Sequence, residues 1–404
     1  VAGKTTAELH QQATFSGWDF TSIWKIVENS STPYLDWQYD SSLSGVVYSN
    51  AGVTPLANAI IAFYVNGADS GTATSASDGS YCFLMETAPT AATPLLLYIS
   101  GNAVKGNTVT LSNGTDMPGV DIFGSNVIVR HENAGPITNT DMGNAKGALA
   151  DTDVLYSVTG TDADVNSSLY VKSTYGPGGK IDIQDDLLIH GTFLTADDVT
   201  IGGDWMGYGN FTCTNGTAYF SGSDQIVAHG NSPNRFYNLE HTGTGTLTLN
   251  GEDIYLTNDL KNSGGTLTTK GGDYHVGGSL TNDGVFDEVT GATGSSYGYV
   301  DGDFINNDTY KQSDYGSLDI KGSFENNGTL ALGTNSYMYL SGTGDQHLLL
   351  GTGAYLYMFE YSGSGSMVLD DPSLDVNYFA MSGSGSFDAS TKDITTDGSF
   401  SLRG

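Results

Sequence analysis

The chain has 404 residues, 55 of them glycine, and 45 acidic against 14 basic side chains give it a formal net charge of −31. Phosphate recognition needs clustered Lys and Arg, so this balance excludes nucleic acid as a partner. The 24 Tyr and 16 Phe favour a folded all-β protein over a disordered one, and without a run of 18 apolar residues no membrane span is expected.

Residues 1–42 hold three of the four tryptophans and are predicted to be a docking or capping segment. A short helix should follow an N-cap at Thr5 or Thr6, and short strands are expected at 14–15, 24–27 and 35–38. A segment of this length cannot bury a core of its own. We therefore expect its aromatic side chains to pack against another surface. The stretch KTTAELHQQATFSGWDFTSIWKIVENSSTPYLDWQ resembles a segment common in large prokaryotic surface proteins, often near the end of a β-solenoid.

Residues 43–125 are predicted to form an antiparallel β-sandwich. The stretches 44–67, 78–85 and 93–101 alternate apolar and polar residues between Gly and Pro turns, which is typical of such sheets. The elements S-G-x-V, A-x-I-x-F and D-G-S-Y-x-F resemble carboxypeptidase-regulatory-like, immunoglobulin-type modules. That resemblance implies a spacer, and occasionally a carbohydrate binder.

A repeat dominates the rest of the chain, after a junction with irregular first turns at 126–179. One pattern of apolar residues, a Gly or Asn, an acidic or hydroxyl residue and then an aromatic or Leu recurs in VTIGGDW, IYLTNDL, YHVGGSL, GYVDGDF and LDIKGSF. The acidic or hydroxyl position falls at Asp259, Ser279, Asp303 and Ser323, in steps of 20, 24 and 20 residues. A period near 20 with strand chemistry predicts a right-handed parallel β-helix over 180–404.

The apolar positions of the repeat should point inward and form a continuous ladder, at Ile201, Leu256, Val276, Val300 and Ile320. A longer repeat lies on the first, because FYNLEHTGTGTLTL (236–249) returns as LYMFEYSGSGSMVL (356–369), 120 residues later. Two related blocks are therefore expected, at about 199–280 and 318–402. These motifs resemble those of filamentous-haemagglutinin-like and other giant prokaryotic surface adhesins, which implies a structural or adhesive role.

The final segment, ITTDGSF (394–400), begins the repeat again, and an open turn exposes backbone groups that can pair with another strand. We therefore expect residues 1–40 of one copy to dock on the β-helix end of the next and build a homopolymer. The alternative is that the chain is a slice of a longer polypeptide. The expected interface comprises Trp18, Phe20, Trp24, Tyr34, Trp37, Ile394 and Phe400.

An enzyme is the rival interpretation, because many β-helices cleave polysaccharides. Only Arg235 lies deep in the repeats, and no acidic cluster or Gly-His-Gly element accompanies it, so no catalytic residues are assigned. One candidate calcium site follows the start of a D-x-D-x-N loop at Asp162, Asp164 and Asn166, although it lacks the later Gly and Glu. No other cofactor is expected, and a carbohydrate-binding or carbohydrate-cleaving β-helix stays the alternative function.

The remaining signals concern the cell surface. Two cysteines, Cys82 and Cys213, fit a secreted bacterial or archaeal surface protein better than a disulfide scaffold. The chain starts at Val1 without a signal-peptide pattern, so we expect any such peptide to have been removed. Surface glycans and other cells are candidate partners. Seven Asn-x-Ser/Thr sequons would permit glycosylation, at Asn29, Asn113, Asn166, Asn210, Asn215, Asn307 and Asn327.

Overall fold

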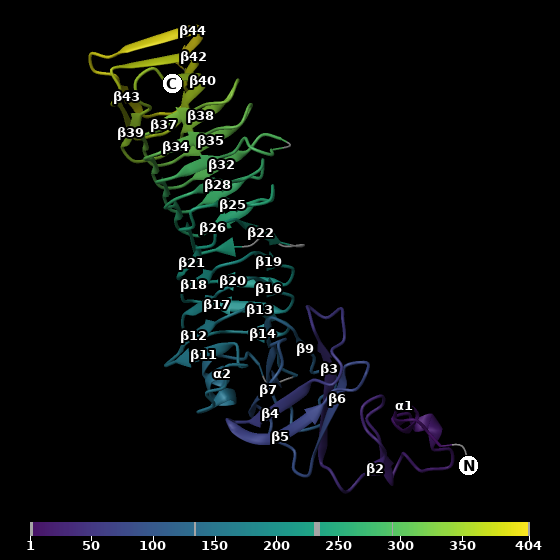
Figure 1. Ribbon diagram of the computed structural model, residues 1–404. Helices are drawn as coiled ribbons and strands as arrows, with labels where there is room; N and C mark the ends of the chain where they lie inside the picture. Colours follow the sequence, from purple (N-terminus) through teal and green to yellow (C-terminus); the bar gives the residue numbers. More distant parts are fainter. Residues whose placement is uncertain (1–2, 133–134, 230–234, 293, 403–404) are drawn as a thin grey trace. The chain divides into compact units, whose positions relative to one another are not determined.

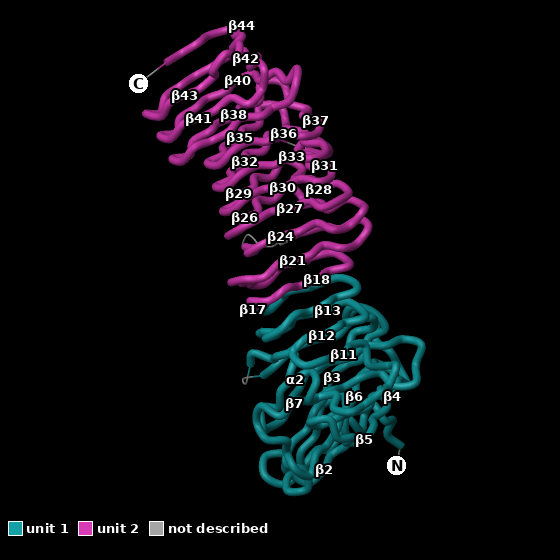
Figure 2. The backbone as a smooth tube through the Cα atoms, turned by 90° about the vertical axis from the view of Figure 1, so that its left-hand side faces the viewer, with its two compact units in different colours: residues 1–194 teal, residues 195–404 magenta. Residues whose placement is uncertain are grey.

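The computed structural model describes residues 3–132, 135–229, 235–292 and 294–402. The chain is all-β, with 47% of residues in strands and 4% in helices, and it contains a β-solenoid of about 14 turns (Figure 1). It divides into two compact units, residues 1–194 and 195–404, coloured separately in Figure 2. Among the described residues, no helix is both long enough and apolar enough to cross a membrane.

The N-terminal segment of the first unit has little regular structure. Thr5 caps the helix α1 (Thr6–Leu9) in a capping box with Glu8, as predicted. The strand expected at 14–15 is wrong, because a 3₁₀ turn η1 (Gln12–Thr14) occupies this region and the Thr14 hydroxyl donates to the Glu8 carbonyl at 2.6 Å. The strands β1 (Trp24–Lys25) and β2 (Tyr34–Leu35) pair antiparallel.

A small β-sandwich follows, and its two sheets enclose an apolar core. The first sheet contains β3 (Ser41–Tyr48), β6 (Ser80–Met85) and β9 (Ile122–Phe123), and the second contains β4 (Ile60–Val65), β5 (Ala68–Thr74), β7 (Pro94–Ser100) and β8 (Asn107–Leu111). Alternate residues of facing strands are fully buried together, among them Val47 on β3, Phe63 on β4 and Leu97 on β7. The members of this core lie at alternate positions of their strands, as the sequence predicted, but β3, β7 and β8 are also buried on their other side.

The second sheet of the sandwich continues directly into the first turns of the solenoid. β8 pairs in parallel with β10 (Asn126–Val129), which pairs with β13 (Ser168–Val171) and then β16 (Leu187–Ile189). The outer side of β7 is also buried, because an unpredicted helix α2 (Asn139–Lys146) packs on it with Met142 and Ala145. Thr138 and Asp141 cap this helix reciprocally.

The remaining strands of the first unit complete its solenoid turns. β11 (Tyr156–Thr159) pairs antiparallel with β12 (Asp162–Val165), which pairs in parallel with β15 (Ile181–Ile183). β14 (Thr174–Tyr175) pairs in parallel with β17 (Thr192–Thr195).

In the second unit, parallel strands stack into three sheets, here called faces A, B and C. Face A contains β18 (Val199–Ile201), β21 (Thr217–Phe220), β24 (Asn238–His241), β27 (Leu260–Asn262), β30 (Leu280–Asn282), β33 (Phe304–Asn306), β36 (Phe324–Asn326), β39 (Gln346–Leu349), β41 (Ser366–Leu369) and β43 (Ser386–Asp388). Face B contains β19 (Trp205–Gly207), β22 (Gln225–His229), β25 (Thr246–Thr248), β28 (Thr266–Thr268), β31 (Val285–Asp287), β34 (Thr309–Lys311) and β37 (Thr329–Ala331). Face C contains β23 (Arg235–Phe236), β26 (Ile254–Leu256), β29 (Tyr274–Val276), β32 (Tyr297–Val300), β35 (Ser317–Ile320), β38 (Tyr337–Leu340), β40 (Tyr355–Tyr361), β42 (Ser373–Met381) and β44 (Asp393–Leu402). A further strand, β20 (Asn210–Cys213), lies between β19 and β21 in sequence.

The interior of this solenoid is mostly apolar, and a column of buried polar side chains runs along face A. The five predicted inward residues are all buried, at exposures of 5% or less. The predicted continuous ladder is wrong for Ile201, which lies on face A, whereas Leu256, Val276, Val300 and Ile320 are successive partners on face C. The polar column on face A is a buried amide ladder, in which each Asn side chain donates to the Asn in the next turn. The distances are 2.8 Å from Asn262 to Asn282, 2.7 Å from Asn282 to Asn306 and 2.6 Å from Asn306 to Asn326. Every member therefore has partners, as a buried amide requires.

The two sequence blocks do not occupy the same faces. The segment VTI (199–201) forms β18 on face A, whereas its counterpart LDI (318–320) forms β35 on face C. Likewise NLEH forms β24 on face A, and the matching MFEY lies in β40 on face C. The matching inward positions are buried in both blocks, since His241 and Tyr361 are 1% and 0% exposed. The second block thus repeats the chemistry of the first on a neighbouring face.

Candidate functional site

The aromatic residues of the N-terminal segment form a cluster that its own chain covers only in part. Trp18 contacts Phe15 and Trp24, with ring centroids 5.0 Å and 4.3 Å apart, and Phe20 stacks on it at 6.5 Å. Trp18 is still 44% exposed. In the described part of residues 1–40, only Ser31 and Tyr34 are buried. The segment has no core of its own, as its length predicted.

Two other predicted interface residues of this segment behave in opposite ways. Tyr34 is 8% exposed, and its burial raises its pKa to about 12, so it belongs to the attachment between the segment and the sandwich. The Ser80 hydroxyl of β6 also donates to the Asn29 carbonyl at 2.9 Å. Trp37 is 79% exposed, the largest exposure among the large apolar side chains described. It is therefore available for contact with another molecule.

The last described strand of face C, β44, presents an unpaired edge and an uncovered part of the solenoid core. It pairs with β42 on one side, and no described strand pairs with its other side. Phe359, Phe379 and Phe400 occupy the same inward position on β40, β42 and β44, and their exposures are 0%, 1% and 51%. Leu402 is 64% exposed at the neighbouring inward position, and Ile394 is half-buried.

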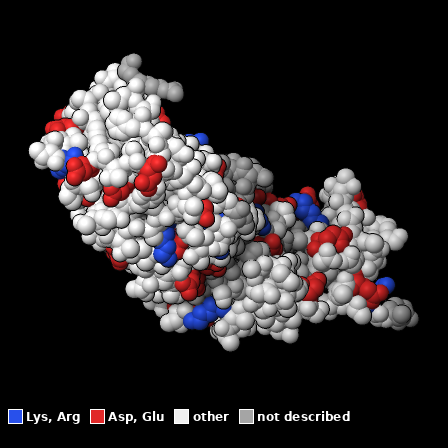
Figure 3. Space-filling model, turned by 90° about the horizontal axis from the view of Figure 1, so that it is seen from above, with Lys and Arg blue, Asp and Glu red and all other residues white. Residues whose placement is uncertain are grey.

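The acidity of the second unit is largely explained by the corners of its turns. Aspartates at these corners accept the backbone N–H of a residue one turn later. Asp204 accepts the N–H of Ile226 at 2.8 Å, and Asp224 accepts the N–H of Thr246 at 2.8 Å. The repeat position found in the sequence does the same, at 2.8 Å from Asp259 to Ser279 N–H and 2.7 Å from Asp303 to Ser323 N–H. These carboxylates are structural, and Figure 3 shows acidic side chains scattered over the face in view rather than gathered at one place.

The candidate calcium residues lie on a strand instead of in a loop. Asp162 and Asp164 belong to β12, and Asn166 follows it. Asp162 accepts the N–H of Lys180 at 2.9 Å, and Asp164 accepts the hydroxyl of Ser157 at 3.2 Å. Among the described residues no group of three His, Cys, Asp or Glu is placed to hold a metal ion. The two aspartates of this motif bind protein groups.

The seven sequon asparagines all lie in turns or at the beginnings of strands, where a glycan has room. Asn113 is half-buried and the other six are exposed. Asn307 and Asn327 lie at equivalent corners of successive turns, where the Asn327 amide donates to Asn307 at 3.1 Å. A glycan on either residue would replace part of this contact. Their modification stays a prediction.

The two cysteines are free thiols and do not form a bridge. Burial raises the pKa of Cys82 to about 12 and also raises the pKa of Cys213. Neither thiol is therefore activated as a nucleophile.

A polar pair lies in a groove of about 500 Å³ on face A. The ring Nδ1 of His347 is 2.9 Å from Asp370, and Asp303, Glu325 and the apolar Leu349 line the same groove. The backbone N–H of His347, not its ring, bonds to the Ser323 hydroxyl, at 3.0 Å. The Ser, His and Asp here therefore do not have the contacts of a nucleophilic triad.

A row of tyrosines follows the outer side of face C and its corner with face B. Tyr357 lies between Tyr337 and Tyr378, with ring centroids 5.9 Å and 5.4 Å apart. The pKa of Tyr357 is raised, first by partial desolvation and then by the nearby phenols of Tyr378, Tyr337 and Tyr315. Further back on the same face, His275 is stacked between Tyr255 and Tyr299, at 4.6 Å and 4.5 Å.

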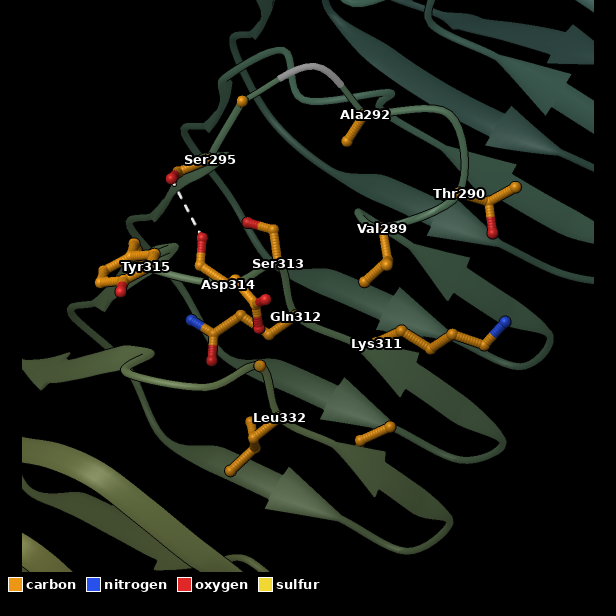
Figure 4. Close-up of a pocket in the computed structure, with 13 residues that line it drawn as sticks. Val289, Thr290, Ala292, Ser295, Lys311, Gln312, Ser313, Asp314, Tyr315 and Leu332 are labelled. Atoms are coloured by element: carbon orange, nitrogen blue, oxygen red, sulfur yellow. Dashed lines mark hydrogen bonds between the residues drawn. The ribbon is translucent and has the colours of Figure 1, made fainter.

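The row of tyrosines begins beside a pocket of about 660 Å³ on the second unit (Figure 4). Tyr315 lies at this pocket with 60% of its surface exposed and a backbone φ of 58°. A left-handed backbone costs a bulky residue about 1–2 kcal/mol. Behind the pocket, the fully buried carboxyl of Glu288 accepts the hydroxyls of Tyr274 and Tyr310 at 2.8 Å and 2.7 Å, and the N–H of Ser313 at 3.2 Å.

Sequence reasoning missed both the pocket and the buried carboxyl. The one available signal was the 24-residue step between Ser279 and Asp303, which is four residues longer than its neighbours. The extra residues lie in the corner that forms one wall of the pocket.

The chain stands apart from the proteins with which it was compared. No protein family model, no curated protein and no solved structure matches it.

Proposed function

We propose that this protein is a structural subunit of an extracellular filament or adhesin, on the surface of a bacterium or archaeon, and that copies of it join head to tail. The N-terminal aromatic segment of one copy would bind the β44 end of the next. Such a contact joins two different surfaces, so it does not close on itself and the assembly can grow. The surface glycans of other cells would be contacted by the exposed faces.

The observation that carries this proposal is the inward row of β44, which no described residue covers. Covering Phe400 and Leu402 would stabilise the contact by about 1–2 kcal/mol each, since both are still about half exposed or more. The free edge of the strand adds backbone hydrogen bonds to any partner that is extended. On the other side of this contact, Trp37 and Trp18 of the N-terminal segment offer a complementary apolar surface.

The repeat chemistry supports a mechanical role. Each turn is joined to the next by the corner carboxylates, the amide ladder and the continuous sheets. In such a stack, stability is a sum over contacts between neighbouring turns, and turns can be added without changing the design.

Sedimentation velocity and negative-stain electron microscopy of the whole chain test the proposal. We expect polymers for the natural chain and monomers for Phe400→Glu, because a charge on the inward row cannot be buried against an apolar partner. Tyr297→Glu is the matched control, since Tyr297 is 44% exposed on β32 of the same face, which pairs with β29 and β35 and not with β44.

Trp37→Ala tests the N-terminal side of the contact, whereas Phe400→Glu tests the β44 side. We expect it to shorten the polymers as well. If Phe400→Glu disperses the polymers and Trp37→Ala leaves them unchanged, the head-to-tail arrangement is wrong. A natural chain that sediments only as a monomer at all concentrations would contradict the whole proposal.

A further inference from the structure

The pocket beside Tyr315 is built by one unusually long corner. Nine residues (288–296) separate β31 from β32, whereas five residues (312–316 and 332–336) occupy each of the next two corners. All three corners line the pocket. Val289 and Ala292 lie on the long corner and Leu332 on the last one, while Ser313 and Asp314 lie between them (Figure 4).

The backbone of the middle corner is strained at an aromatic residue, Tyr315. The Gly316 N–H donates to the Ser313 carbonyl at 3.0 Å and closes a tight turn, in which Tyr315 has a φ of 58°. The next two corners close the same turn with Asn335 at 59° and Gly353 at 82°. Asn and Gly are the residues that tolerate this conformation. Tyr315 takes their place at a cost in stability, and such strain is typical of ligand contacts.

The groups around the ring match the two sides of a sugar. The exposed face of an aromatic ring packs on the C–H face of a pyranose, and hydroxyl and carboxylate groups next to it bond to the sugar hydroxyls. Here Ser295 and Asp314 lie beside Tyr315. The Ser295 hydroxyl fixes the corner by donating to the Asp314 carbonyl at 3.0 Å, and Oδ1 of Asp314 accepts the Thr334 N–H at 2.6 Å, so Oδ2 is the atom of this carboxylate offered to a ligand. The small apolar residues of the long corner complete a wall of the pocket.

The charges of the pocket favour an uncharged ligand. Lys311 is the basic residue among those that line it, and its ammonium group is 2.9 Å from Asp287 and points away from Tyr315 (Figure 4). Asp314 is exposed at the pocket, and the whole chain carries −31. The negative charge would repel an acidic polysaccharide, whereas a neutral polysaccharide carries only uncharged hydroxyls and is not repelled.

We propose that this pocket binds a neutral glycan, with Tyr315 as the stacking platform and Asp314 and Ser295 as hydrogen-bonding groups. A glycan chain that leaves the pocket meets Tyr337, Tyr357 and Tyr378, which continue the aromatic surface along successive turns. Turns are about 4.8 Å apart, close to the length of one sugar unit. This binding does not depend on the polymerisation proposed above, because the pocket lies on the side of the stack.

Affinity electrophoresis of the whole chain in native gels provides the test. The gels contain dextran, galactomannan, glucomannan or xyloglucan, with polygalacturonate as the anionic comparison. We expect at least one neutral polysaccharide to slow the natural chain, and Tyr315→Asn to weaken that binding by about tenfold or more. Tyr315→Phe should still bind, since it keeps the ring. Tyr208→Asn is the matched control, because Tyr208 is 53% exposed and does not line the pocket.

A stability measurement separates a binding role from a structural one. Because Asn tolerates the left-handed turn, Tyr315→Asn should raise the Tm by about 2–4 °C while it weakens binding. Ala292→Phe, which fills the pocket and leaves Tyr315 intact, should abolish binding. The proposal is overturned if no neutral polysaccharide slows the natural chain, if Tyr315→Asn or Ala292→Phe binds as well as the natural chain, or if polygalacturonate alone is bound.

Discussion

The buried carboxyl of Glu288 makes the stability of the second unit depend on pH. Glu288 is 1% exposed, and its desolvation raises its pKa from 4.5 to about 7. The folded protein therefore holds this proton more tightly than the unfolded chain does. Its contribution to stability is fully present below about pH 4.5 and is lost as the pH rises to about 7. A shift of this size corresponds to about 3 kcal/mol.

Glu288→Gln removes the titration and keeps an acceptor for the hydroxyls of Tyr274 and Tyr310. Its amide nitrogen cannot accept the N–H of Ser313, so one hydrogen bond is lost, at a cost of about 1 kcal/mol. We therefore expect the variant to be less stable than the natural chain at pH 5 and more stable at pH 8, where the natural chain buries a charge.

Thermal melts of both chains at half-unit steps from pH 4.5 to 8 measure this difference. Subtraction of the two curves at each pH removes the contribution of every other titrating group. Parallel curves would refute the reasoning, because they would mean that Glu288 has the same pKa in the folded and unfolded chains.

Three further predictions concern individual contacts. Asn282→Ala should destabilise the second unit by about 2–4 kcal/mol in denaturant melts, since it interrupts the amide ladder on both sides; Asn307→Ala, at an exposed corner, should cost far less. Gly298→Ala should destabilise by about 2–3 kcal/mol or more, because its Cβ would lie 2.3 Å from the Tyr274 ring; an unchanged Tm would show that the ring moves freely. Cys82 should resist iodoacetamide at pH 8 until the chain unfolds, and rapid labelling by mass spectrometry of the native chain would contradict its burial.

The 20-residue period was enough to predict stacked parallel strands and their inward residues. It succeeded because apolar residues at fixed spacing have one way to leave water in such a chain, and Gly, Asn and Asp favour the corners. The same period located Asp259 and Asp303, but only the structure shows why they recur, as acceptors for the backbone of the next turn.

Other features depend on contacts between residues far apart in the sequence. The 120-residue repeat predicted two equivalent blocks, but matching segments such as 199–201 and 318–320 lie on different faces, A and C. Similar sequence sets which side chains point inward and not which face a strand joins. The helix α2 is short and weakly patterned, so its packing on β7 decides its existence. The pocket at Tyr315 needs three corners from successive turns. The sequence alone therefore determined the stacking of strands, while tertiary packing decided which faces, corners and buried charges meet.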